Sequence, residues 1–366
     1  MSFQLPAYHA PDFSLPCFTG APDAAAAPAP RDGVAPEGFH STGIDPEYFK
    51  VGGRWVLAPE IRMDCVPVLR ENGFIDIVEF RRLKEGDTVL LGRTEDGSQG
   101  IYINSDPFAS KESASLNFSF RKGRTRETGF SRDYREIVEL LRYERENGGC
   151  CVWVLGPAFT FDDMARDAFC RIVRAGYVQA LLAGNALATH DLEGSYLHTA
   201  LGADITTQKA QPNGHYNHLD VINRVRRSGS IKQFIEDCRI DNDIMYSLVK
   251  NDVPFVLTGS IRDDGPLPEV IGDAYQGQGA MRGLIKKCTT IICLATMLHT
   301  IAAGNMTPSY RVLPDGTVRP VYLYAVDADE FVVNKLLDRG SLSATTIVTN
   351  VQDFITLVSR GLGVMA

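Results

Sequence analysis

The sequence predicts an α/β protein in which a doubly wound, mostly parallel sheet follows a smaller β-rich domain. From Cys150 onward, short apolar runs alternate with segments of helical periodicity, and the runs are apolar nearly throughout instead of at every second residue. Parallel strands have this composition because helices cover both faces of their sheet. The chain of 366 residues is also longer than one core usually supports, which favours two domains.

Composition and charge narrow the class of protein. The formal net charge is −8 and no long run of Lys or Arg occurs, which argues against a nucleic-acid partner. The N-terminus lacks the pattern of a signal peptide, and the most apolar late stretch, 288–303, is too short and too polar to span a bilayer. The eight scattered cysteines suit reduced thiols. We therefore expect a cytoplasmic protein without a membrane partner.

Three regions are expected along the chain. Residues 1–31 read as a flexible tail, because the stretch 20–30 (GAPDAAAAPAP) has little to bury. Residues 32–130 read as the β-rich domain, since turn dipeptides such as Glu85-Gly86 separate short β-prone runs. Residues 131–366 read as the α/β domain, which opens with an amphipathic helix over 133–146.

Within the α/β domain, apolar runs predict strands, and apolar spacings of three and four residues between boundary signals predict helices. In chain order the expected elements are a strand within 150–158, a helix over 160–176, a strand and loop within 177–191, three helices between 217 and 250, a strand within 253–259, a helix over 267–287, a strand within 289–296, a helix from about 297, a strand within 319–329, a helix over 330–339, a strand within 344–350 and a helix over 351–361.

A charged loop follows the strand expected at 253–259. It places Arg262, Asp263 and Asp264 between two glycines, which is how open α/β sheets build ligand sites for cofactor enzymes. The planar fork of Arg262 suits a carboxylate and the two aspartates suit an ammonium group, so the loop could hold an amino acid. An internal Arg–Asp pair that stiffens the loop is an equally good interpretation. Lys250, just before the strand, is either catalytic or a solvated helix end.

Five strand ends combine small and polar residues. Because the carboxyl ends of a doubly wound sheet line one crevice, the set favours a ligand site, although any single glycine is better explained as a turn. The five are LGPA (155–158, with Gly156 and Pro157), AGNALATHD (183–191, with Gly184 and Asn185), TGSIRDDG (258–265, with Gly259 and Ser260), ATMLH (295–299, with Thr296 and His299) and VDAD (326–329, with Asp327).

The chain has no GxGxxG motif, so bound phosphates would need other backbone N–H groups. Candidates are those near Gly184 and Asn185, and those near Gly304 and Asn305. Asp327, between a strand and a helix, suits a ribose hydroxyl and is equally explained as a helix N-cap.

The spacing of the histidines does not match a metal site. His215 and His218 are three residues apart, and His190 and His198 are eight apart, but no Cys or carboxylate cluster completes a zinc pattern. We therefore predict no metal, and favour imidazoles that hydrogen-bond substrate or core groups.

Several long motifs resemble one family, the archaeal-type ornithine cyclodeaminases, which are related to the C-terminal part of the cyanobacterial bifunctional arginine dihydrolase/ornithine cyclodeaminase. The resemblance covers about residues 32–362. It implies an N-terminal region of the kind called the lysine-oxoglutarate reductase/saccharopine dehydrogenase (LOR/SDH) conserved region, a deoxyhypusine-synthase-like NAD-binding domain, and a homo-oligomer, either dimer or tetramer. The motifs are DGVAPEGFHST (32–42), VWVLGPA (152–158), LLAGNALATHD (181–191), KNDVPFVLTGSIRDDGPLP (250–268), ATMLHTIAAGN (295–305) and DRGS (338–341).

The resemblance implies conversion of L-ornithine to L-proline and ammonia with a recycled NAD. The α-carbon hydride leaves, the δ-amine attacks the resulting imine, ammonia departs and the cyclic imine takes the hydride back. We assign Arg262 to the carboxylate, Asp263 or Asp264 to the amine, and a base role to Lys250, His218 or His299. The NAD candidates are Gly156, Pro157, Gly184, Asn185, Gly259, Ser260, Thr296, Gly304, Asn305 and Asp327.

Two departures leave the substrate open. GHYNH (214–218) is usually more basic at its middle positions in this family, and the stretch 104–130 looks divergent. The alternatives are an NAD-dependent dehydrogenase of another amino acid, an aminoalkyl transferase that uses a polyamine and a nucleophilic lysine, and a non-catalytic NAD-binding regulator.

Overall fold

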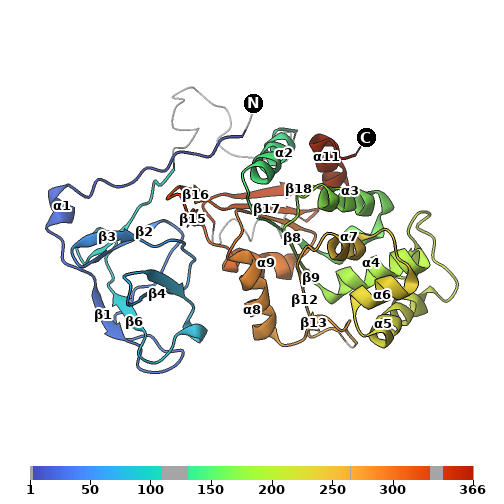
Figure 1. Ribbon diagram of the computed structural model, residues 1–366, viewed down its shortest axis with the longest axis horizontal. Coiled ribbons are helices and arrows are strands. Elements are labelled where there is room, and N and C mark those ends of the chain that lie inside the picture. The colour runs from blue at the N-terminus through green and yellow to red at the C-terminus, as the bar shows by residue number, and fades with distance from the viewer. Residues whose placement is uncertain (1–2, 109–130, 264, 330–340, 366) are drawn as a thin grey trace.

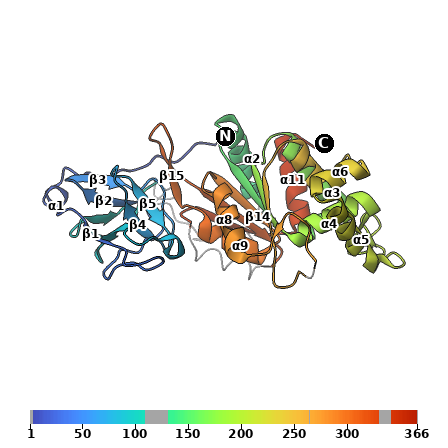
Figure 2. The same ribbon diagram turned by 60° about the horizontal axis from the view of Figure 1, so that its bottom comes forward.

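The computed structural model describes residues 3–108, 131–263, 265–329 and 341–365, and shows a β-rich lobe beside an α/β lobe (Figures 1 and 2). The helix expected over 330–339, most of the stretch 104–130 and Asp264 lie outside the described residues. No helix in the described ranges has the length and apolarity needed to cross a membrane.

The α/β lobe is built on a sheet of seven strands, all paired in parallel, in the order β13-β12-β9-β8-β14-β17-β18. This confirms the predicted parallel sheet. β8 and β14 are buried at every residue, as their continuous apolar sequences require. The strands are β8 (Cys151–Leu155), β9 (Ala180–Gly184), β12 (Phe255–Thr258), β13 (Val270–Ile271), β14 (Thr290–Leu294), β17 (Tyr322–Asp327) and β18 (Ala344–Val348).

The strand order reverses between β8 and β14. From β8 the chain proceeds outward through β9 and β12 to β13, and then returns to place β14 on the other side of β8. Loops on the two sides of such a switch point lead away from each other, and a crevice opens at the carboxyl ends of the two strands.

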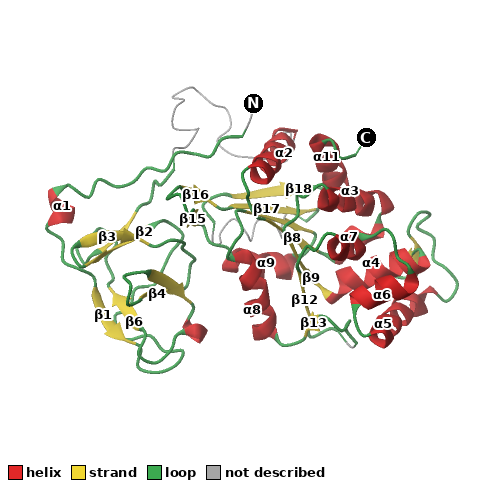
Figure 3. Cartoon of the chain, in the orientation of Figure 1, coloured by secondary structure: helices red, strands yellow, loops and turns green. Residues whose placement is uncertain are grey.

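Helices cover both faces of the sheet (Figures 1 and 3). One face packs against α2, α3 and α11 in a core that includes Trp153 and Phe354, and the other packs against α8 and α9 in a core around Ile291. The three helices expected between 217 and 250 are present as α5 to α7. The helices are α2 (Ser131–Glu146), α3 (Asp163–Arg174), α4 (Asn185–Leu197), α5 (Asn217–Ser228), α6 (Ile231–Cys238), α7 (Ile244–Lys250), α8 (Ala274–Ile285), α9 (Met297–Met306) and α11 (Val351–Leu362), with 3₁₀ turns η2 (Pro157–Phe161) and η3 (Gly214–Tyr216).

Two element predictions were wrong. Residues 185–191 do not form a loop after β9, because helix α4 begins directly at Asn185. The helix expected from 267 begins only at Ala274, where the side chain of Asp273 accepts a hydrogen bond from Gln276 N. The residues before it form strand β13, which pairs with β12 at the sheet edge, so tertiary pairing overrides the local helical pattern.

The β-rich lobe contains two antiparallel sheets, β1-β6-β4-β5 and β3-β2-β7. The tail does not run irregularly as expected. Residues 25–28 pair with β6 as strand β1, and the rings of Phe13 and Phe18 contact Trp55. The elements of this lobe are α1 (Pro16–Thr19), β1 (Ala25–Pro28), β2 (Glu47–Val51), β3 (Arg54–Leu57), β4 (Val66–Leu69), β5 (Ile75–Val78), η1 (Phe80–Arg82), β6 (Thr88–Leu91) and β7 (Ile101–Ile103).

A late hairpin joins the two lobes. Strands β15 (Tyr310–Val312) and β16 (Val318–Pro320) leave the α/β lobe, and the buried Tyr310 packs into the core of the β-rich lobe. Its hydroxyl donates to Ala58 O at 2.6 Å. At the same junction Glu79 lies between Arg62 and Arg282, of which Arg282 comes from α8. A second short hairpin, β10 (Thr199–Ala200) and β11 (Ala203–Asp204), follows α4.

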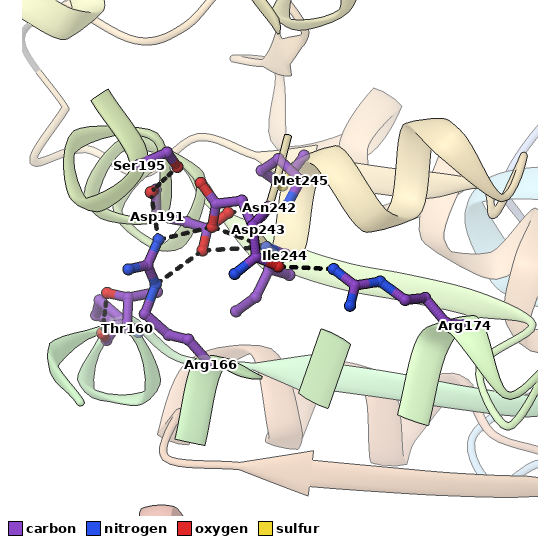
Figure 4. A network of polar contacts seen from close by, with 10 residues as sticks. Thr160, Arg166, Arg174, Asp191, Ser195, Asn242, Asp243, Ile244 and Met245 are labelled. Carbon is purple, nitrogen blue, oxygen red and sulfur yellow. Dashed lines mark hydrogen bonds and ion pairs between the residues drawn. The ribbon is translucent and has the colours of Figure 1, made fainter. Parts of the chain in front are cut away.

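A buried polar network fastens α4 to α3 and α7 (Figure 4). The Arg166 guanidinium donates to Asp243 Oδ1 at 2.7 Å and to Asp191 Oδ1 at 3.3 Å, and Asp191 also accepts from Met245 N at 2.8 Å. Burial and the charge of Asp191 raise the pKa of Asp243 well above its usual range, although Arg166 opposes the shift. The raised pKa favours protonation of Asp243, which relieves the repulsion between the two neighbouring carboxyl groups.

Replacing Asp191 or Asp243 with asparagine should change the free energy of unfolding by different amounts. We expect Asp191→Asn to lower the free energy of unfolding by about 3 kcal/mol or more, because the buried Arg166 loses its charge partner. Asp243→Asn should cost less than about 1 kcal/mol at neutral pH, because the amide resembles the protonated acid. Urea titration of the wild type and of both variants measures these differences.

The pH dependence gives a second readout of the same pair. Native Asp243 keeps its proton to higher pH than the unfolded chain does, so its stabilisation is complete below the unfolded pKa of about 3.9 and is lost as the pH rises. The stability of the wild type relative to Asp243→Asn should therefore fall as the pH rises above about 3.9. If the free energy of unfolding changed with pH equally in the wild type and in Asp243→Asn, the raised pKa of Asp243 would be contradicted. Asp167→Asn, which breaks an exposed pair on α3, is the matched control and should change little.

Candidate functional site

A pocket of about 320 Å³ opens at the carboxyl ends of the central strands, where the order of the sheet reverses. It receives side chains and backbone from the ends of β8, β9, β12 and the turn after β14. The pocket is lined by Leu155, Pro157, Gly184, Asn185, Ala186, Leu187, Thr258, Ser260, Arg262, Asp263, Thr296, Leu298 and His299. Eight of the residues predicted from the sequence thus lie together.

Two helices begin at this pocket. Gly184 is the N-cap of α4 and Thr296 is the N-cap of α9, and neither supplies a side-chain capping hydrogen bond. The first N–H groups of both helices therefore need other partners, and the helix dipoles favour a negative charge there. This donor set fits the phosphates of a dinucleotide, which commonly rest on a helix N-terminus at a switch point.

A close approach of two backbones brings α9 to β8. Gly156 N donates to Leu294 O at 2.8 Å, and a Cβ at Gly156 would collide with Ala295 O. Ala295 adopts a left-handed conformation with φ of 53°, which turns the chain sharply from β14 into α9. Gly156 is therefore required for backbone packing beside the pocket, even though the residue does not line it.

His299 spans the floor of the pocket. Its Nε2 lies 2.8 Å from Thr258 Oγ1 and its Nδ1 lies 3.2 Å from Thr296 Oγ1, so the imidazole bridges β12 and α9. The ring also covers Gly184, where a Cβ would stand only 2.9 Å from Cε1. Burial lowers the pKa of His299, although the charge of nearby Asp263 opposes the shift. Burial therefore favours the neutral form of this imidazole.

The charged loop after β12 is held at both ends. Asp263 Oδ2 accepts from Ser260 N at 2.8 Å, and Asn185 Oδ1 accepts from Leu267 N at 3.0 Å. Arg262 is exposed at the rim, and its guanidinium forms no ion pair with any described residue. The internal Arg–Asp pair considered from the sequence is therefore absent among the described residues, and Asp264 is outside them.

Several predicted site residues lie elsewhere. Lys250 ends α7, which precedes β12, so it lies toward the amino ends of the parallel strands and lines separate surface hollows. Gly304 and Asn305 lie near the C-terminal end of α9, where free carbonyl groups disfavour a phosphate. Asp327 ends β17, beyond β14, and its Oδ1 accepts from Asp329 N at 3.0 Å. His218 belongs to α5 and does not line the pocket.

Gly259 has a structural role in the sheet. Thr258 is a pocket residue that the sequence did not indicate. Gly259 N donates to Ile271 O at 2.9 Å and thereby holds β13. Thr258 is the last residue of β12 and holds Nε2 of His299. Its place at a predicted strand end was visible in the sequence, but nothing there indicated its histidine partner. The described residues contain no group of three His, Cys, Asp or Glu that could bind a metal.

Comparison with known proteins shows similarity to one family and to several of its members. Residues 135–358 match the family described as "Arginine dihydrolase ArgZ-like, C-terminal, Rossmann fold". An ornithine cyclodeaminase of Methanocaldococcus jannaschii is 39% identical over 338 residues, which cover 90% of this chain and 76% of that protein. The bifunctional arginine dihydrolase/ornithine cyclodeaminase AgrE of Nostoc is 36% identical over 349 residues, which cover 93% of this chain and 47% of AgrE.

Two solved structures extend the comparison. A conserved LOR/SDH protein from Methanococcus maripaludis has a TM-score of 0.83 at 35% identity, with 93% of this chain and 98% of that chain covered. AgrE in a ternary complex with ornithine and NAD⁺ has a TM-score of 0.58 at 34% identity, with 95% and 47% covered.

The position of His299 leads to a titration experiment. Because burial disfavours the imidazolium, we expect its NMR titration midpoint below the ordinary value of 6.5. The spectrum of a His299→Gln variant assigns the resonance by its disappearance. A midpoint at or above 6.5 would show that the ring is solvated or faces a stronger negative charge than the structure indicates.

Proposed function

The chain belongs to the family of the archaeal ornithine cyclodeaminases and of the ArgZ-like C-terminal Rossmann region, and from this premise we propose that it converts L-ornithine to L-proline and ammonia with a recycled NAD. The family resemblance predicted from the sequence is thereby confirmed, whereas the likeness to deoxyhypusine synthase stays a prediction. The observation that carries the proposal is the pocket itself, which places two helix N-termini, an imidazole and a charged loop around one space at the switch point.

NAD, when bound, supplies a hydride acceptor that later returns the hydride. In this proposal the N–H groups at the starts of α4 and α9 hold its phosphates. Pro157 and His299, which line the pocket, would form an apolar and an aromatic wall beside the bound cofactor. Because both nitrogens of His299 are engaged by threonine hydroxyls, the imidazole is better suited to holding position than to taking up protons.

The charged loop supplies the groups that an amino acid with a second amine requires. Arg262 offers the α-carboxylate a guanidinium that has no ion-pair partner among the described residues and that can bind a carboxylate with two hydrogen bonds. Asp263 uses Oδ2 for the Ser260 N–H, while its Oδ1 makes no hydrogen bond to a described residue, so this oxygen suits the δ-ammonium. Closure of this loop over the pocket would exclude water, which would otherwise hydrolyse the imine. Assembly into a homo-oligomer is likewise proposed from the family resemblance.

The first test is a product balance. Purified protein incubated with L-ornithine and catalytic NAD⁺ should form proline and ammonia in equal amounts, without net NADH, as followed by mass spectrometry and by absorbance of the NADH band. Net NADH together with an oxo acid would make the chain a dehydrogenase. Tight NAD binding without turnover of any diamino acid would favour a regulator.

A glycine substitution tests the cofactor site separately. Gly184 has φ of −95°, so alanine is allowed by the backbone, but its Cβ would stand 2.9 Å from His299 Cε1 and displace the ring. We expect Gly184→Ala to weaken NAD binding by roughly tenfold, or about 1.4 kcal/mol, in a calorimetric titration. Gly283→Ala in α8, where a Cβ would meet nothing within 4 Å, is the control and should bind NAD like the wild type. Equal affinities of the two variants would remove Gly184 and His299 from the proposed cofactor site.

A further inference from the structure

The face of α4 that begins at the pocket carries a second imidazole one turn further on. Ala186 lines the pocket, and His190 is four residues later, so their side chains lie on the same side of the helix. His190 also packs edge-on against Phe161, at a ring distance of 5.7 Å. Phe161 ends η2, the turn whose first residue, Pro157, lines the pocket. His190 does not itself line the pocket, but it lies one helical turn from Ala186 and contacts the last residue of η2, so two elements of the pocket wall adjoin it.

A buried carboxylate holds this imidazole. His190 Nδ1 lies 2.9 Å from Glu193 Oε2, and the side chain of Glu193 is fully buried. Glu193 also accepts from Thr199 Oγ1 at 2.8 Å, from Gly202 N at 3.0 Å and from Leu201 N at 3.2 Å. Although burial opposes ionisation, the hydrogen bonds from His190, Gly202 and Thr199 lower the pKa of Glu193. No lysine or arginine forms an ion pair with this carboxylate among the described residues, and the His190 ring is the group paired with it.

The pairing decides the tautomer of the neutral ring. An ionised carboxylate only accepts hydrogen bonds, so Nδ1 of His190 carries the proton and Nε2 keeps its lone pair. Among the described residues Nε2 has no hydrogen-bond partner, and it is not one of the atoms sealed from solvent. The ring of His218 lies 6.2 Å away, and its buried Nδ1 also lacks a partner within the described ranges. Within the described ranges, Nε2 of His190 is thus an acceptor without a partner, and the neighbouring His218 adds a second imidazole nitrogen whose hydrogen-bonding capacity is unmet.

We propose that His190 is the catalytic base of this site and that Glu193 is its positioning residue. The proposal rests on the proposed function and replaces Lys250, His218 and His299 as base candidates. Nε2 takes one proton from the α-ammonium group, which leaves a neutral amine on Cα and an imidazolium that Glu193 stabilises. Cα then loses hydride with the electron pair of its C–H bond, while the lone pair of the neutral amine forms the C=N bond of the iminium.

The δ-ammonium releases one proton to water before its nitrogen attacks the iminium carbon, and the ring nitrogen releases a second proton after the attack. His190 returns its proton to the former α-nitrogen, which departs as ammonia, and the hydride returns to the cyclic iminium carbon. The departing ammonia and the ring nitrogen take up the two protons released to water, so the ornithine cation gives zwitterionic proline and ammonium.

The kinetic test compares three variants with the wild type. His190→Gln should lower kcat by at least about 100-fold and leave the NAD dissociation constant within a factor of two. Glu193→Gln should lower kcat and move the acidic limb of the kcat/KM profile to lower pH, because the imidazolium loses its carboxylate partner. Thr199→Val removes another hydrogen bond of Glu193 without touching the imidazole, and it should reduce stability while the acidic limb stays in place. A His190→Gln enzyme with near-normal kcat, or a limb that moves equally in Thr199→Val, would overturn the proposal.

An NMR measurement tests the pairing of His190 with Glu193, here called the dyad, without depending on turnover. In protein labelled with ¹⁵N-histidine, neutral His190 should carry its proton on Nδ1, with the signal of an unprotonated nitrogen at Nε2, and Glu193→Gln should weaken this preference. Adding L-ornithine and NAD should shift the His190 signals. A proton on Nε2 would overturn the assignment. If the wild type forms no proline while the tautomer is as expected, the substrate proposed above fails and the dyad stands.

Discussion

The parallel pairing of β8 with β14 is the constraint on which the rest of the α/β lobe depends. The two strands are neighbours in the sheet but far apart in the chain, and the segments that follow them lead in opposite directions. Gly156 lets the two strand ends meet, and the left-handed turn at Ala295 starts α9 at once. Displacing either strand would separate the helix N-termini that face the pocket.

Charged side chains have different roles in the scaffold and at the pocket. Arg166 with Asp191 and Arg319 with Glu144 are enclosed pairs whose hydrogen bonds are largely made within the protein, and they hold α4 and α2 in place. At the pocket, Arg262 has no ion-pair partner among the described residues, and the loop that carries it is held by hydrogen bonds from Ser260 N to the Asp263 carboxylate and from Leu267 N to the Asn185 side chain. Paired charges stabilise one packing, whereas an unpaired charge at a rim remains available to a ligand.

Segments that cross from one lobe to the other hold the β-rich lobe against the α/β lobe. The hairpin of β15 and β16 places Tyr310 in the distant core, and the N-terminal segment contributes Phe3 to the rings of Tyr143 and Tyr322 before it crosses to form β1 (Figure 1). Each lobe thus contributes chain to the other, and buried contacts at the junction, including Arg282 with Glu79, oppose their separation.

The sequence by itself determined the parallel sheet and the strand ends that gather at the crevice, because apolar runs and turn residues report burial and chain reversal locally. It also indicated Asn185, Arg262, Asp263, Thr296 and His299, which all lie at strand ends and line the pocket. Only the tertiary structure decided the pairing of β13, the docking of residues 25–28, the exclusion of Lys250 and the partners of each histidine. Thr258 meets His299 across 41 positions of sequence, and such contacts follow from strand order, which no local pattern encodes.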